Sequence, residues 1–122
     1  MANTARAVIR IVDFVDAGNS ISITFQNDDM GGEVSIFETA KNERISPNQF
    51  KIKSSLAETA QSLYDALLAD YGWLSQVGFT VENDRVTIIA SDYGSSFTGS
   101  SNSANITAVS YTHLTLPTTP YV

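Results

Sequence analysis

The segment Ser55–Gly72, SLAETAQSLYDALLADYG, predicts an amphipathic helix whose two ends are both marked in the sequence. Ser55 and Glu58 have the spacing of a capping box, in which the serine hydroxyl accepts from the amide three residues later and the glutamate reaches back. Gly72 is placed to end the helix. Between these ends, apolar residues recur at helical spacing on one stripe: Leu56, Ala60, Leu63, Tyr64, Leu67, Leu68 and Tyr71. This stripe must be covered, so we expect a β-sheet to pack against it.

Two segments before the helix predict a β-hairpin. Ser20–Gln26 (SISITFQ) alternates strictly between polar and apolar residues, which is typical of a strand with one buried face. Ala7–Val15 (AVIRIVDFV) is rich in β-branched residues and predicts another strand. Ala17–Asn19 supplies residues that favour a turn. We therefore expect the two strands to pair with each other.

The remaining strands are expected on both sides of the helix. Glu33–Thr39 predicts a shorter strand, and Phe50–Lys53 predicts an edge strand whose lysines discourage pairing with another chain. Phe79–Glu82 and Arg85–Ala90 flank Asn83-Asp84, a two-residue connection typical of a tight hairpin. Ser91–Asn105 is rich in Gly, Ser and Asn. It predicts either a long surface loop or a flexible lead-in to a last strand, residues 106–108.

These elements predict one α+β domain over residues 1–108. The expected architecture is a small antiparallel β-sheet with one amphipathic helix packed across it, in the order hairpin, helix, hairpin. The side chains expected inside are Ile21, Ile23, Leu63, Leu67 and Ile88.

Residues 109–122 differ in character from the rest of the chain. They carry no charge and contain the only histidine, His113. Val109–Thr118 (VSYTHLTLPT) resembles the translation of a transposase-type sequencing adapter. We therefore expect residues 109–122 to be a non-native tail, in which His113 has no catalytic or metal-binding role, and we expect native sequence to be missing after Ala108.

Composition excludes several classes of protein. Seven Lys and Arg face thirteen Asp and Glu, and the net charge of −6 argues against nucleic-acid binding. There is no cysteine, which excludes disulfides and thiolate metal sites. No segment has the apolar length of a signal peptide or membrane span, so no membrane partner is expected.

Reactive groups are few. With no cysteine and no histidine before residue 109, a nucleophile would have to be Ser or Thr, and no G-x-S-x-G or S-x-x-K motif is present. We expect no enzymatic activity and no cofactor. Candidate metal ligands are Asp28, Asp29 and Glu33, whose oxygens suit Ca²⁺, although their spacing is not that of a standard calcium loop. The same residues equally describe a solvated hairpin loop.

Three aromatic residues at the end of the helix also leave two interpretations open. Tyr64, Tyr71 and Trp73 could form a recognition patch, or they could close the core beneath the helix.

The helix and the hairpin after it resemble a pattern in phage virion proteins, particularly tail-tube, baseplate and related tail components. The resemblance covers Ser55–Leu67, Val86–Ser95 and the late residues Asn102 and Asn105. It implies a structural role without an active site, a location in the virion, and identical subunits or other virion proteins as partners. Without it, a cytoplasmic location would be expected.

Two other functions are compatible with the sequence. The first is a small ligand- or carbohydrate-binding module, with or without a dependence on Ca²⁺, whose site would lie at residues 28–33 or at residues 93–97. The second is an enzyme that uses two carboxylates facing each other across a cleft.

Overall fold

The computed structural model describes residues 5–27, 32–91 and 95–111. One helix and eight strands lie within these ranges. In chain order they are β1 (Arg6–Ile11), β2 (Ser20–Asn27), β3 (Gly32–Lys41), β4 (Gln49–Lys51), α1 (Leu56–Tyr71), β5 (Val77–Glu82), β6 (Arg85–Ala90), β7 (Ser95–Ser101) and β8 (Ile106–Tyr111).

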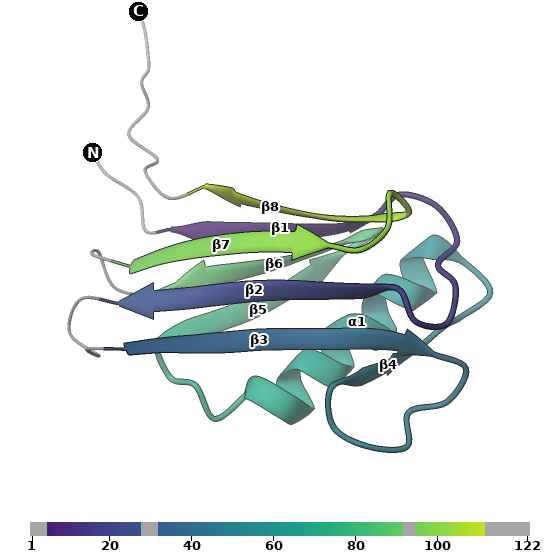
Figure 1. Cartoon of the computed structure of the whole chain (residues 1–122), viewed down its shortest axis with the longest axis horizontal. Coiled ribbons are helices and arrows are strands. Elements are labelled where there is room, and N and C mark those ends of the chain that lie inside the picture. The colour runs from purple at the N-terminus through teal and green to yellow at the C-terminus, as the bar shows by residue number, and fades with distance from the viewer. Residues whose placement is uncertain (1–4, 28–31, 92–94, 112–122) are drawn as a thin grey trace, which may run out of the picture.

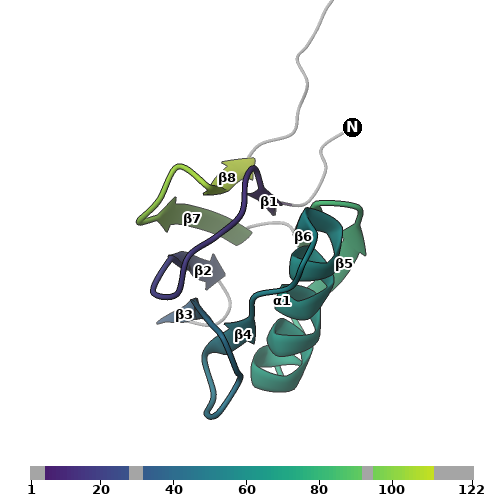
Figure 2. The ribbon, with the colours of Figure 1, turned by 90° about the vertical axis from the view of Figure 1, so that its right-hand side faces the viewer.

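The strands form two four-stranded sheets, with the orders β5-β6-β1-β8 and β4-β3-β2-β7 (Figure 1). All pairs are antiparallel except β3 and β4, which are parallel. The sheets face each other, and α1 lies between the strands β4 and β5 on one side (Figure 2). The predicted α+β class, with one helix packed on the strands, is therefore confirmed, and the strands divide into two sheets.

The helix and the core agree with the sequence pattern. The Ser55 hydroxyl accepts a hydrogen bond from the amide of Glu58 at 3.1 Å, and Gly72 is the C-cap. The turn between β5 and β6 contains Asn83 in the left-handed region, with φ of 53°. Every side chain predicted to lie inside is fully buried: Ile21, Ile23, Leu63, Leu67 and Ile88.

The predicted hairpin between the first two strands is wrong. β1 pairs with β6 and β8, whereas β2 pairs with β3 and β7. The connection crosses from one sheet to the other: the amide of Val12 donates to Asn105 beside β8, and the amide of Gly18 donates to Ala40 in β3. The turn residues at 17–19 permit a hairpin but do not require one. In this fold, β1 instead pairs with strands that are distant in the sequence.

The second difference is β7, because residues 95–101 form a strand and not part of a loop. Their Ser- and Gly-rich sequence has low β-propensity, so the strand depends on its pairing with β2. Phe97 is buried and its ring lies 5.2 Å from that of Phe25, centroid to centroid. At the other end of the chain, β8 continues to Tyr111, so residues 109–111 of the predicted tail pair with β1.

Candidate functional site

β5 is an edge strand, and its outer edge has no neighbouring strand in its sheet. In Figure 2, β5 lies at the margin of its sheet with no other element beyond it. Along β5, the main-chain amides and carbonyls of successive residues point alternately toward β6 and away from it. The hydrogen bond from the amide of Ser91 to the carbonyl of Gln76 shows which residues point toward β6. The main-chain groups of Gly78, Thr80 and Glu82 point toward β6. Those of Phe79 and Val81 consequently point away from the sheet, and neither has a partner among the described residues.

The margin at β4, which belongs to the other sheet, is capped by side chains of the helix. The amides of Lys51, the last residue of β4, and of Lys53, just after it, point outward. They donate to the hydroxyls of Ser62, at 2.9 Å, and Thr59, at 3.1 Å. On the same edge, Arg44 donates to the carbonyl of Gln49 at 2.7 Å. The helix therefore occupies the hydrogen-bonding groups to which another strand would bind.

β4 pairs only with the end of β3, and the outward main-chain groups of the rest of β3 are partly covered by side chains. The amide of Phe37 donates to the hydroxyl of Tyr71 at 3.1 Å, and the side chain of Asn48 donates to the Phe37 carbonyl at 2.9 Å. Only the outward groups of Glu33 and Ser35 extend past this cap, and the exposed charge of Glu33 protects that short stretch.

The edges of β7 and β8 shield each other. A Cβ added at Gly99 would lie 3.1 Å from the Cβ and 3.2 Å from the carbonyl oxygen of Ala108. The hydroxyl of Ser101 also donates to the carbonyl of Ile106 at 2.6 Å. Among the margins that the structure describes, β5 is therefore the one left open over its central residues.

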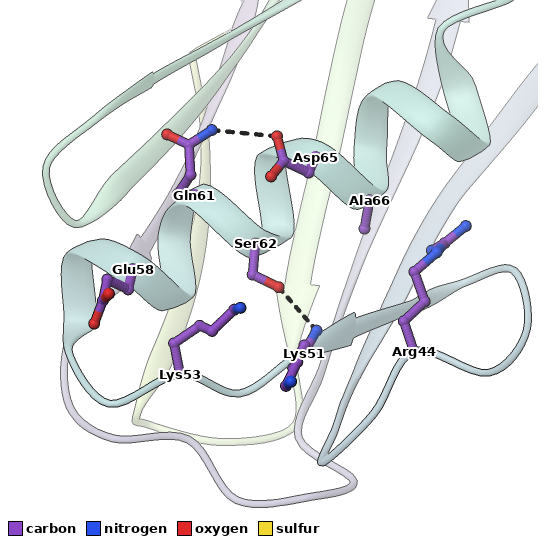
Figure 3. A pocket seen from close by; sticks show the side chains of 8 residues that line it. All are labelled: Arg44, Lys51, Lys53, Glu58, Gln61, Ser62, Asp65 and Ala66. Carbon is purple, nitrogen blue, oxygen red and sulfur yellow. Dashed lines mark hydrogen bonds between the residues drawn. The ribbon is translucent and has the colours of Figure 1, made fainter.

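A groove with a volume of about 420 Å³ lies between β4 and α1 (Figure 3). Cationic side chains come from the β4 side, and carboxylates and an amide come from the helix. The lining residues are Arg44, Lys51, Lys53, Glu58, Gln61, Ser62, Asp65 and Ala66. Within the described chain, the hydroxyl of Ser62 has no hydrogen bond to a base, which a serine nucleophile would need. The groove is suited to recognition of charge.

Beside the groove, three ionisable side chains meet at the end of the helix: Glu38, Arg44 and Asp70. Asp70 accepts two hydrogen bonds from the guanidinium of Arg44, at 2.6 and 3.0 Å, and a third from the amide of Asn48 at 3.0 Å. Glu38 lies on the inward face of β3, is fully buried and has no hydrogen bond within 3.5 Å among the described residues. Its interaction is with the neighbouring carboxyl group of Asp70.

The two carboxyl groups have opposite pKa shifts. Burial, followed by the interaction with Asp70, raises the pKa of Glu38 to about 10. Hydrogen bonds from Arg44 hold the pKa of Asp70 well below its usual range, although its own burial opposes this. At neutral pH Glu38 is therefore a neutral acid beside an ionised Asp70. The hydrogen bonds from Arg44 and Asn48 to Asp70 hold residues 44–48 against the helix. Glu38 is fully buried, so it is not accessible to a substrate.

The predicted calcium ligands are not brought into a cluster that the structure describes. Asp28 and Asp29 lie outside the described residues, and Glu33 is exposed at the start of β3. In the described ranges, no group of three His, Asp, Glu or Cys side chains could hold a metal ion.

The aromatic candidates separate into two environments. Tyr64 packs against the core and Tyr71 is buried, whereas Trp73 is exposed and its indole donates to the carbonyl of Asp70 at 2.9 Å. Of the second predicted ligand loop, Tyr93 lies outside the described residues. Phe97 is buried in β7, so it is not available to a ligand.

Glu38 and the edge of β5 were not among the residues that the sequence pattern singled out. The alternation that places Val34 and Ile36 on one face of β3 places Glu38 on the same face, so its burial had a signal. The open edge of β5 had no signal in the sequence, because it depends on the order of strands in the sheet.

No helix in the described chain combines the length and apolar character needed to cross a bilayer. The sequence matches no protein-family model and no curated protein.

Proposed function

We propose that this protein is a non-enzymatic structural component of a virion, and specifically of a phage tail. Its partners are identical subunits or other virion proteins, which it meets through strand edges and loops. The observation that carries the proposal is the unpaired edge of β5, where Phe79 and Val81 offer amides and carbonyls to another strand. The resemblance of the helix and following hairpin to phage tail components supports the same role.

Assembly of the full chain tests this proposal. Light scattering after size-exclusion chromatography, over a wide range of concentrations, should show oligomers, and electron microscopy should show rings or longer assemblies. Coexpression with proteins encoded beside it should yield complexes. A chain that stays monomeric at high concentration and captures none of these proteins would count against a structural role.

The groove beside β4 favours a second candidate, a small ligand-binding module. Three cations, Arg44, Lys51 and Lys53, line one side of it. A ligand that binds only the folded protein must raise its thermal midpoint. Melts with Ca²⁺, with oligosaccharides and with small polycarboxylates test this function. A shift of several degrees that is lost in Lys53→Ala would favour it over assembly.

A further inference from the structure

The edge of β5 has the composition of a strand that binds another strand. Its sequence, VGFTVE, contains no proline and no lysine, and its one charge is Glu82 at the end. The fold caps β4 and part of β3 with hydroxyl, amide and guanidinium groups. The edges of β7 and β8 lie against each other. Edges exposed without such protection tend to pair with further chains.

We propose that the edge of β5 pairs in antiparallel fashion with β5 of a second copy of this chain. This inference rests on the proposed structural function and names its first partner. The two four-stranded sheets containing β5 would join into one continuous sheet across a two-fold axis.

The directions of the main-chain groups select one register. Phe79 must lie opposite Val81 of the second copy, because only then do both outward-facing residues of each strand exchange their amide and carbonyl groups. A register one pair lower would use the amide of Val77, which already donates to the carbonyl of Leu74 at 3.3 Å. A register one pair higher would require Asn83, which lies in the turn with φ of 53°.

The side chains suit this register. Phe79 would lie beside Val81 of the second copy on the half-buried face, and apolar cross-strand pairs of this kind stabilise sheets. On the exposed face, Thr80 would lie opposite Thr80 of the second copy, as a non-hydrogen-bonded pair with Cα atoms about 4.5 Å apart. Glu82 would face Gly78, so no like charges oppose each other.

The position of Thr80 on the axis allows a charge-swap experiment with the full chain. Thr80→Lys and Thr80→Glu each place two like charges together, so each variant should dimerise at least tenfold more weakly than the native chain. An equimolar mixture of the two should recover dimers, because opposite charges then meet. Thr87→Lys is the matched control: Thr87 lies beside Thr80 on the same face, one strand inside the edge, and its replacement should leave the dimer intact.

Val81→Pro gives an independent measurement, since it removes an outward amide from each copy and leaves the ladder with β6 unchanged. It should abolish the dimer. If this variant fails to fold, as judged by circular dichroism, the charge swap alone decides. Dimers that are insensitive to Thr80→Lys, or a mixture that does not recover, would overturn the inference. The proposed function would survive those results if other assemblies form, and it fails only if no assembly or complex forms.

Discussion

Glu38 places a carboxylic acid in the fully buried interior. Its ordinary pKa of 4.5 rises to about 10 through burial and the neighbouring Asp70. The unfolded chain therefore releases this proton above pH 4.5, whereas the folded chain keeps it up to about pH 10. Folding takes up a proton in that interval, so the stability contributed by this group decreases as the pH rises through it. Asp70 acts in the opposite sense, because its contribution is present above its ordinary pKa of 3.8 and is lost at lower pH.

Glu38→Gln should remove this pH dependence. Glutamine has a similar shape and no proton to take up, so we expect the variant to be more stable than the native chain by about 1–3 kcal/mol at pH 8. Urea unfolding between pH 6 and 9 measures the effect: the native free energy of unfolding should fall with pH, and that of the variant should not. Glu33→Gln, on the exposed face of the same strand, should keep the native slope. Parallel pH profiles for the native chain and Glu38→Gln would contradict the assignment.

At the scale of elements, α1 both covers the core and completes the edge of β4. Its buried residues include Leu63 and Leu67, and its hydroxyl residues Thr59 and Ser62 bind the amides of the strand beside it. Thr59 binds the amide of Lys53 and Leu63 packs in the core. One face of the helix can do both, because residues four apart lie on the same side.

Thr59→Val should separate these two roles. Valine keeps the volume of threonine, but it leaves the amide of Lys53 without an acceptor beside a buried side chain. We expect a loss of about 1–3 kcal/mol of stability and faster hydrogen exchange at the Lys53 amide. Thr59→Ser retains the acceptor and should preserve the slow exchange. Unchanged exchange in Thr59→Val would show that the hydroxyl does not cap the strand.

At the scale of the whole molecule, the core between the two sheets is covered differently on its two sides. The helix fills the side between β4 and β5, and β7 lies directly against β8 on the other (Figure 2). The second closure depends on Gly99, because a larger residue would press on the Cβ and the carbonyl of Ala108.

Gly99→Val should therefore destabilise the protein by about 1–3 kcal/mol, since the two edges would have to separate. Gly78→Val is the matched control. A Cβ at Gly78 meets no atom within 4 Å, and valine favours strands, so that variant should be as stable as the native chain or more so. Thermal unfolding compares them. Equal midpoints for the two variants would mean that β7 and β8 can separate at little cost.

The sequence alone determined the features that depend on local chemistry. The helix from its serine cap to Gly72, the alternating strand β2 and the turn at Asn83 follow from hydrogen bonding and periodicity within a few residues. The buried side chains predicted on these elements are correct for the same reason. The tertiary structure decided which strands are neighbours: β1 and β2 lie in different sheets, and the serine-rich β7 is a strand because β2 pairs with it. It also brought Glu38 beside Asp70 and left β5 open. These outcomes depend on contacts between residues far apart in the chain, which no local pattern encodes.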